Sequence, residues 1–312
     1  MEKAEKREKP SGKQLGVALA LMVGSYLAFQ LCNMVMKLNQ ELHEASGPET
    51  YYYMSLFKLP LFSLVLKLSK QDPLEVRPDM RIFVLLRVLA GGMTNCLLFI
   101  AFQFTAFSKA TTILFTNSLL LPFFAYLLNK EPIQKSDVAG ILLAFAGMLL
   151  VVQPFQAPTD NHWHHDLFGC SVAFLSSITY ALAVVFIQKL SKAGVHFTIN
   201  CFIDSFGGLL ASPILLFFFP RIQLPEYGAP YFLLALGSAL FYFLAIISFN
   251  YAIRFLTGGT VGIIMYLSIP ISLIFDVFLF QHEPNHIELA GMAIIFSVNI
   301  IMSILKIKGI VA

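Results

Sequence analysis

One short pattern occurs twice in this chain. Lys130-Glu131-Pro132 followed by Asp137-Val138-Ala139-Gly140 returns as His282-Glu283-Pro284 followed by Glu288-Leu289-Ala290-Gly291, each time between two long apolar runs. A second pattern near the start, the small residues Gly16, Ala20, Gly24 and Ala28, returns as Gly169, Ala173, Ser177 and Ala181. Gly140 and Gly291 are 151 residues apart, and Gly16 and Gly169 are 153 apart. Nearly equal offsets at both ends of a 312-residue chain predict two copies of one structural unit.

The composition indicates a membrane protein. Apolar residues make up 57% of the chain and charged residues 12%, against roughly 45–50% and about 25% in soluble domains. Crossing the hydrocarbon core takes about 20 residues of helix, and we identify ten apolar ranges near that length. They run over residues 14–36, 50–69, 80–103, 108–129, 134–153, 166–188, 196–219, 229–252, 257–280 and 287–305.

Helices are the expected element of each range, because a segment in lipid must satisfy its backbone hydrogen bonds internally. The predicted fold is therefore an all-α polytopic membrane protein with ten transmembrane helices. The stretch up to Lys13 is charged and precedes no short apolar run with a cleavage site, so we expect no removable signal peptide. The ends, residues 1–13 and 306–312, are predicted to be tails outside the membrane.

Basic residues are distributed unevenly between the two ends of the predicted bundle. If the loops alternate between sides, sixteen Lys and Arg residues lie on the side of the N-terminus, and only Lys37, Lys109 and Arg221 lie on the other. By the positive-inside rule, both termini are predicted to face the cytosol. We interpret this asymmetry as an orientation signal rather than as a nucleic-acid footprint, because no basic stretch alternates with exposed aromatic residues.

Two copies in ten crossings contain five crossings each. An odd number places the second copy upside down, so residues 14–153 and 166–305 are predicted to form inverted repeats joined by a loop at 154–165. Inverted repeats around a site near the bilayer midplane are a recurrent plan of secondary transporters. The alternative is a duplicated membrane scaffold that moves no solute, since a fold does not establish an activity.

The doubled pattern resembles the EamA-type units of the drug/metabolite transporter superfamily over nearly the whole chain. Each half has a span ending in Glu-Pro, a short polar turn, and Ala-Gly opening the next helix. Ala101-Phe102-Gln103-Phe104 and Ser248-Phe249-Asn250-Tyr251 before the fourth and ninth spans add to the resemblance. The halves differ in one proline: Pro270 corresponds to Ser118, and the first half has Pro122 one turn later.

This resemblance implies a ten-helix carrier that works by alternating access around a central cavity. It also implies that the fifth and tenth spans are peripheral and serve homodimer contacts. Nucleotide-sugar and sugar-phosphate carriers are relatives, so a nucleotide-sugar transporter of the secretory pathway is the leading alternative. The phosphate carriers use basic residues in the ninth helix, whereas residues 257–280 contain no Lys or Arg. That departure disfavours a multiply charged phosphate substrate.

Two charged residues lie within matching spans of the two halves. Lys58 lies near the middle of the second span and Asp204 lies in the seventh. A charge at such a depth costs about 2.5–3.5 kcal/mol on insertion scales, so it usually faces a partner or a cavity. Our hypothesis is that Lys58 and Asp204 form a gating ion pair or the polar anchor of the site, with the ammonium meeting a substrate carboxylate. The alternative is that Lys58 snorkels or pairs structurally.

Roles are also predicted for two other charged residues and for proton coupling. Arg87 lies near the start of the third span, so its long side chain is expected to reach the interface and act structurally. Asp276 lies near a helix end, where a rim position is expected. Asp204 is the better candidate for a proton-coupling carboxylate, a role that requires burial.

Uncharged polar residues form a broader candidate set. Individually each is more often an interhelical hydrogen bond, worth about 0.6 kcal/mol, so the hypothesis of a shared lining rests on their collective placement. The set comprises Tyr26, Gln30, Asn33, Asn95, Asn117, Tyr180, Asn250 and Tyr266.

Other features predict structure rather than chemistry. The small-residue rows of the first and sixth spans are expected to be helix packing surfaces. His162, Trp163, His164, His165 and Asp166 lack a defined ligand geometry, so no metal site is predicted. No nucleophile with its base and no phosphate-binding loop occurs, so we predict neither enzymatic activity nor a cofactor. The expected partners are a small organic solute and the lipid bilayer.

Overall fold

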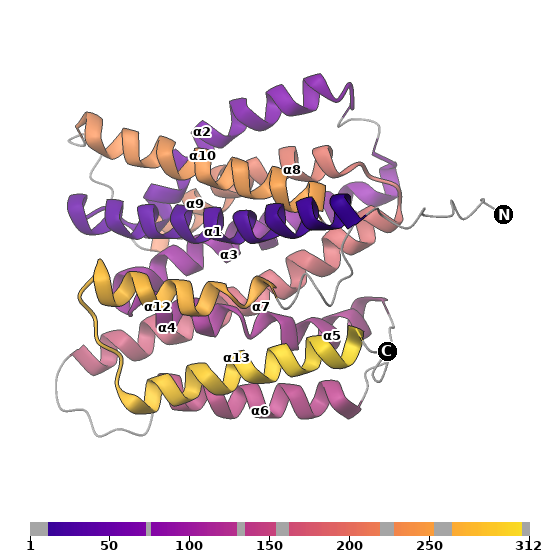
Figure 1. The fold of residues 1–312 in the computed structure, drawn as a ribbon. Coiled ribbons are helices and arrows are strands. Elements are labelled where there is room, and N and C mark those ends of the chain that lie inside the picture. Colours follow the sequence, from indigo (N-terminus) through magenta and orange to yellow (C-terminus); the bar gives the residue numbers. More distant parts are fainter. Residues whose placement is uncertain are drawn as a thin grey trace.

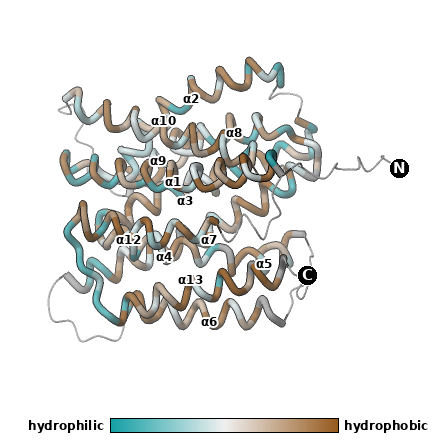
Figure 2. The backbone as a smooth tube through the Cα atoms, viewed as in Figure 1, coloured by the Kyte–Doolittle hydropathy of each residue, from teal (hydrophilic) through white to brown (hydrophobic). Residues whose placement is uncertain are grey.

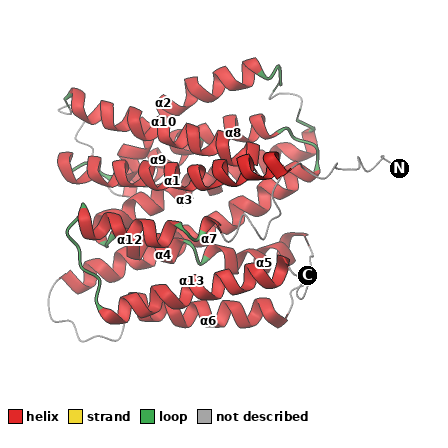
Figure 3. Cartoon of the chain, in the orientation of Figure 1, coloured by secondary structure: helices red, strands yellow, loops and turns green. Residues whose placement is uncertain are grey.

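The structure, a computed structural model, describes residues 12–72, 76–129, 135–153, 162–218, 228–252 and 264–307. Within these ranges the chain is helical, and it contains no strand (Figure 3). The first half comprises α1 (Gly12–His43), α2 (Gly47–Leu68), the 3₁₀ helix η2 (Pro78–Met80), α3 (Arg81–Phe104), α4 (Phe107–Leu114), α5 (Asn117–Asn129) and α6 (Lys135–Val152). The second comprises α7 (His162–Lys192), α8 (Phe197–Ser205), α9 (Gly207–Phe218), α10 (Ala229–Ala252), α12 (Ser268–Phe278) and α13 (His286–Ile307).

Local sequence signals explain where several helices begin. Ser46 precedes α2, and its hydroxyl accepts a hydrogen bond from the backbone N–H of Glu49, while Pro48 occupies the first turn. Asn285 and Glu288 cap α13 reciprocally: each side chain accepts a hydrogen bond from the other residue's backbone N–H. These are the N-cap and capping-box arrangements, which satisfy backbone donors that a helix leaves unpaired at its first turn.

Three of the predicted spans contain a break in the helix within the described residues. The range 108–129 divides into α4 and α5 at Phe115 and Thr116, and the range 196–219 divides into α8 and α9 at Phe206. In the range 257–280, a turn at Tyr266 and Leu267 precedes α12. Pro122 and Pro213 lie inside α5 and α9, so the interruptions do not coincide with these prolines. Gly258, Gly259 and Gly262 of the ninth span lie outside the described residues. Interrupted helices free backbone groups inside a bundle, which is tolerated where protein surrounds them.

Figure 1 shows the helices running roughly parallel or antiparallel in one bundle, with the start of α1 and the end of α13 at the same end of the bundle. The most extensive packing joins α1 to α10, α3 to α7, and α6 to α13. Each of these pairs combines a helix of the first half with one of the second. The pair α6 and α13 lies along one edge of the bundle (Figure 1), where Gly147 and Gly291 bring the two backbones together.

The small-residue rows differ between the two halves, contrary to the expectation that both pack. Gly169, Ala173, Ser177 and Ala181 are buried in α7, but Gly16, Ala20 and Gly24 of α1 are exposed. Burial in α1 instead follows Ala18, Met22, Tyr26 and Gln30. These precede their α7 counterparts by 151 residues rather than 153, and two residues rotate a helix by about 200°. The offset of 153 therefore compared opposite faces of the two helices.

The helices carry largely apolar residues (Figure 2). Among the described residues, six helical segments are long and apolar enough to cross a membrane, namely Lys13–His43, Pro78–Phe104, Phe107–Leu128, His164–Ser191, Phe197–Phe217 and Ala229–Ala252. Val138–Val152, Ser268–Phe278 and His286–Met302 are shorter apolar helices. The α2 helix lies in the second predicted range and carries the buried Lys58. The helical segments therefore indicate a multi-pass membrane protein.

Candidate functional site

A buried ion-pair network joins the two halves inside the bundle. Arg87 Nη2 of α3 lies 2.9 Å from Asp204 Oδ1 of α8, and Lys58 Nζ of α2 lies 3.8 Å from Asp204 Oδ2. The Lys58 side chain is 0% exposed and that of Asp204 6%. We call Lys58, Arg87 and Asp204 the central cluster. Two cations of the first half thus share a single carboxylate of the second.

Two tyrosines complete the surroundings of Lys58. Its Nζ lies 4.3 Å from the ring centre of Tyr242 and 4.8 Å from that of Tyr51. The Tyr242 hydroxyl donates a hydrogen bond to Asp204 Oδ2. The Tyr51 hydroxyl accepts hydrogen bonds from Asn95 Nδ2 at 3.2 Å and from Lys58 Nζ at 3.5 Å. The ammonium therefore lies between two aromatic faces, which attract a cation electrostatically.

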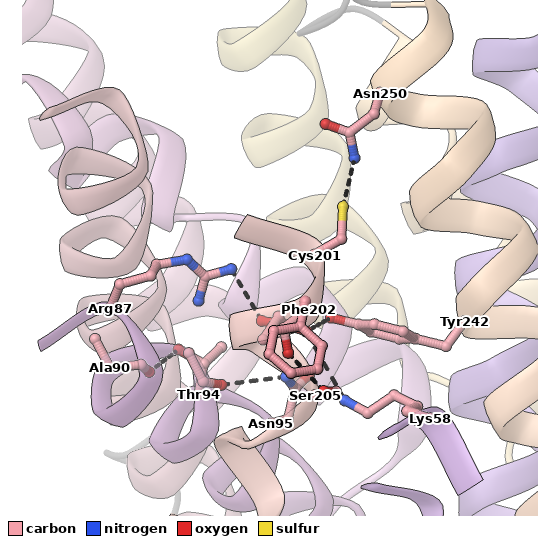
Figure 4. A network of polar contacts seen from close by, with 12 residues as sticks. Lys58, Arg87, Ala90, Thr94, Asn95, Cys201, Phe202, Ser205, Tyr242 and Asn250 are labelled. Carbon is pink, nitrogen blue, oxygen red and sulfur yellow. Dashed lines mark hydrogen bonds and ion pairs between the residues drawn. The ribbon is translucent and has the colours of Figure 1, made fainter. Parts of the chain in front are cut away.

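Close helix packing brings these side chains together. A Cβ atom added to Gly92 of α3 would lie 2.3 Å from the backbone oxygen of Gly207, so α3 can touch the start of α9 only because this residue is glycine. Gly208 similarly approaches Ser55 of α2. Gly207 and Gly208 follow directly after the break at Phe206 that ends α8. Figure 4 shows Lys58, Arg87 and Tyr242 reaching the α8 segment from different helices.

The prediction for Arg87 was wrong. Its side chain does not extend to the interface: it points into the bundle and pairs with Asp204, and the residue is 9% exposed. The guanidinium Nε is buried and has no hydrogen-bond acceptor among the described residues. The depth of Arg87 along α3 is compatible with a side chain that reaches the interface and with one that points inward. Its position on the inward face of α3 determines that it points into the bundle.

Two residues of the predicted polar set lie next to the central cluster. Asn95 contacts Tyr51, and Asn250 donates to Cys201 Sγ at 3.4 Å, one turn before Asp204 (Figure 4). Tyr180 is partly buried on α7. Tyr26 is buried on α1 and packs against Phe29 and Phe249, and Tyr266 is buried beside Phe115. Asn95 and Asn250 are thus the members of the set that hydrogen bonds place next to the central cluster.

Three members of the set lie differently. Gln30 is buried on α1, and its Oε1 has no hydrogen-bond partner within the described part of the chain. Asn33 is partly buried on the same helix. Asn117 donates to the backbone oxygen of Leu114 at 2.6 Å, so its side chain bridges the break between α4 and α5. This local role explains Asn117 without a substrate.

A second charged cluster lies near the end of the bundle opposite the chain termini. Lys109 Nζ of α4 lies 2.9 Å from Asp166 Oδ2 of α7 and 2.8 Å from Glu288 Oε1 of α13. We call Lys109, Asp166 and Glu288 the end latch. The Thr105 hydroxyl also donates to Asp166, and the backbone N–H of Asn285 donates to Glu288. One cation here joins two carboxylates, and it ties the first half to the second.

Asp276 is a further correction, because it is buried rather than at the rim. Its carboxylate accepts hydrogen bonds from the backbone N–H groups of Phe107 at 3.1 Å and Ser108 at 2.6 Å. An acidic side chain at a helix N-terminus satisfies free donors and complements the helix dipole. Asp276 therefore ties α12 to the first turn of α4, next to the end latch.

Tyr51 and Tyr242 were missed by the sequence analysis. Tyr51 precedes Lys58 by seven residues, which places both on one face of α2, and this spacing was the available signal. Tyr242 gave none, since α10 is apolar on all sides and its interior face cannot be identified from the pattern. Two equivalent residues of the halves also contact each other. Phe115 and Tyr266 are separated by 151 positions in the sequence, and their ring centres lie 6.2 Å apart.

The apolar helices and the buried charges between them define a multi-pass integral membrane protein. The chain belongs to the EamA-like transporter family, whose model matches residues 14–153 and again residues 167–304. This confirms the resemblance inferred from the Glu-Pro and Ala-Gly patterns. Members of the family are transporters, which agrees with the prediction that the chain is not an enzyme.

Several named proteins are similar to this chain. Solute carrier family 35 member G1 of Mus musculus is 26% identical over 223 residues, covering 68% of this chain and 58% of that protein. The Homo sapiens protein of the same name is 25% identical over 233 residues, covering 72% and 63%. An uncharacterized transporter of Bacillus subtilis, YetK, is 29% identical over 160 residues, covering 50% and 47%. The matches thus span less than two thirds of each relative's length.

A solved crystal structure has a similar fold. It superposes with a TM-score of 0.59 at 14% sequence identity, over 94% of this chain and 98% of that one. At this identity the likeness concerns the fold alone.

Proposed function

We propose that this protein is a membrane carrier of small organic metabolites that works by alternating access, with the central cluster as its substrate and gating site. The observation that carries this proposal is the buried network in which Lys58 and Arg87 of one half share Asp204 of the other. Ionisable groups within membrane segments are costly, and they commonly mark substrate or ion pathways. A network that only held two halves together would need no surplus charge.

An inverted-repeat arrangement of ten crossings is part of the proposal. Two equivalent hydrogen bonds support it: Ser25 Oγ donates to the backbone oxygen of Ala245 at 2.9 Å, and Ser176 Oγ donates to that of Thr94 at 2.8 Å. The two donors, Ser25 and Ser176, are 151 residues apart, and so are the two acceptors, Thr94 and Ala245. The helix α1 of the first half packs on α10 of the second, and the equivalent helix α7 of the second half packs on α3 of the first. This correspondence is expected of two copies related by a pseudo-twofold axis.

We further propose that both termini face the cytosol. The end latch then lies on the opposite, non-cytosolic side of the membrane. Gln103 Nε2 donates to the backbone oxygen of Ala45 at 2.9 Å, and Lys37 pairs with Glu41 at 3.8 Å, at this same end. At the cytosolic end, Leu66, Val88 and Ile203 belong to an apolar cluster between α2, α3 and α8. Alternating access requires the end latch to break, because its ion pairs join the two halves at the non-cytosolic end.

Asp204 is a weaker candidate for proton coupling than its burial suggested. It is paired with two cations and accepts a hydrogen bond from Tyr242. Protonating this carboxylate would leave two buried cations without a counter-charge, and that is energetically costly. We therefore assign Asp204 to gating and to holding Lys58 and Arg87 in place.

Homodimer formation through α6 and α13 stays a proposal. Their facing surfaces already pack on each other through Gly147 and Gly291. Large apolar side chains on the outward faces, including Leu142, Phe145 and Ile301, are exposed and would contact lipid or a second copy. Crosslinking at Phe145→Cys in vesicles tests this: a dimer band that Leu233→Cys, an exposed control on α10, does not give would support the contact.

A solute screen tests the carrier proposal. The purified protein would be heated with amino acids, nucleosides, nucleotide sugars, amines and carboxylates, because a ligand of the folded state raises the unfolding temperature. Each stabilising solute would then be tested for uptake into proteoliposomes. We expect uptake by the wild-type chain and its loss in Lys58→Met. Uptake of a nucleotide sugar would identify the alternative carrier, and absence of any uptake would favour a scaffold.

A further inference from the structure

The central cluster carries a surplus positive charge. Lys58 and Arg87 contribute two cations and Asp204 one carboxylate, and the cluster is buried within the bundle. A buried charge without a partner is strongly unfavourable, so buried charges are normally paired. Among the described residues no second carboxylate pairs with Lys58 or Arg87. The site is therefore complementary to one additional negative charge.

The hydrogen bonding of Lys58 is incomplete as well. An ammonium has three donors, but among the described residues Lys58 Nζ contacts Tyr51 Oη at 3.5 Å and Asp204 Oδ2 at 3.8 Å. Both distances exceed the 2.7–2.9 Å range of charge-assisted hydrogen bonds. Arg87 makes such a bond to Asp204 at 2.9 Å. Asp204 is therefore bonded mainly to Arg87, and Lys58 has N–H donors available for another acceptor.

Arg87 also keeps a donor. Its buried Nε has no acceptor within the described part of the chain, although its Nη2 is bonded to Asp204. The two cationic side chains flank the same aspartate from α2 and α3. An acceptor group placed beside Asp204 could accept from both, as a carboxylate does with its two oxygens.

We propose that the central cluster binds an organic monoanion through its carboxylate group, with Lys58 as the main determinant of charge selectivity. This inference rests on the proposed carrier function and deepens it. One bound carboxylate brings the cluster of two cations and one anion to neutrality. The rings of Tyr51 and Tyr242, which flank Lys58, offer apolar faces to the organic part of the solute.

A single negative charge fits the rest of the site better than a phosphate does. The described part of the ninth predicted span contributes only uncharged residues and the buried Asp276, which is engaged with α4. A dianion would add a second negative charge to a cluster with a surplus of one cation. We therefore expect preference for monocarboxylates over dicarboxylates and over phosphate esters.

Matched solute pairs and matched variants test this inference. The purified full-length protein would be titrated with benzoate and benzamide, with pyruvate and its amide, and with succinate, while unfolding temperature and ligand affinity are measured. We expect a monocarboxylate to bind at least 10-fold more tightly than its amide, since a charged hydrogen bond is worth about a factor of 10 or more. Lys58→Met should abolish this preference, whereas Lys58→Arg should retain it.

Lys67→Met is the control, because Lys67 lies on the same helix but is exposed. It removes the same charge from the chain and should leave the preference intact. Equal affinity for acid and amide, or an unchanged preference in Lys58→Met, would overturn the inference, as would failure of all the monocarboxylates to bind. Uptake of an uncharged or cationic solute by the same preparation would leave the carrier proposal standing while the anion inference fails.

Discussion

The central cluster and the end latch each contain three charged residues, but with opposite proportions. In the centre two cations share one carboxylate, and one of the pairs is long at 3.8 Å. In the latch one cation lies 2.8 and 2.9 Å from two carboxylates, each of which accepts a further hydrogen bond. The latch is therefore complete within the protein, whereas the centre has cationic donors to spare. A structural tie and a binding site differ in this respect.

The largest expected effect follows from removing the only carboxylate of the centre. Asp204→Asn leaves Lys58 and Arg87 buried together without a counter-charge, and breaking a buried pair in this way costs about 3–5 kcal/mol. Thermal unfolding in detergent should show a marked loss of stability. Asp79→Asn, at an exposed position, should not. Adding Lys58→Met to Asp204→Asn should recover part of the loss, and full stability of the single variant would contradict the account.

The latch variant Lys109→Met should open the non-cytosolic end rather than unfold the protein. It removes both ion pairs that hold α4 against α7 and α13. Cys170 lies beneath this contact, 3.7 Å from Thr105 Oγ1, and is 1% exposed. With the other cysteines replaced, its reaction with an impermeant thiol reagent should accelerate roughly 10-fold, the factor equivalent to 1.4 kcal/mol. Unchanged labelling, as expected for Lys67→Met, would show that the latch holds nothing closed.

Helix packing at the centre is tested by Gly92→Ala. The new methyl group would lie 2.3 Å from the backbone oxygen of Gly207, so α3 and α9 must separate. Overpacking of this kind costs about 1–3 kcal/mol, and it should reduce uptake because it moves Arg87 relative to Asp204. Gly16→Ala meets no atom within 4 Å and is the matched control. Equal stability of the two variants would mean that the close approach is unimportant.

The smallest effects should be equal in the two halves. Ser25→Ala and Ser176→Ala each remove one interhelical hydrogen bond, worth about 0.6 kcal/mol on average in membranes. Helix packing is expected to be symmetric between the two halves, although the charged clusters are not. Both variants should then lower stability by the same small amount. Ser171→Ala, which removes a bond within α7 itself, serves as the reference. A severalfold difference between Ser25→Ala and Ser176→Ala would break the proposed symmetry.

Particular residues show how far the sequence could predict the site. The contact of Lys58 with Asp204 was predictable, because a charge at that depth needs a partner and the duplication placed both in matching spans. The inward direction of Arg87 was not, since a helix that is apolar on nearly all sides does not reveal its interior face. For the same reason the exposed Gly16 and Gly24 were taken for a packing surface. The break at Phe206 was also missed, although Gly207 and Gly208 follow it directly, because a glycine pair in an apolar run equally predicts the close helix packing that these residues make.

Fold prediction succeeded where it depended on length and hydrophobicity. Helices occupy described parts of each predicted apolar range, but they extend beyond some of them: α1 continues to His43 and α7 begins at His162. Hydropathy is insensitive to such extensions, because an amphipathic turn outside the membrane continues the same helix. The buried position of Asp276 depended on a contact with α4, which no local pattern of α12 encodes.

Side-specific labelling tests the central claim most directly and needs no known solute. Asn95, partly buried and bonded to Tyr51 beside Lys58, would be replaced by cysteine in a chain without native cysteines. An impermeant thiol reagent would be applied to either face of sealed vesicles. Alternating access predicts reaction from both faces, and Lys109→Met should raise the rate from the non-cytosolic face and lower it from the cytosolic face. Reaction from neither face, or from one face with no effect of Lys109→Met, would contradict a carrier built around the central cluster.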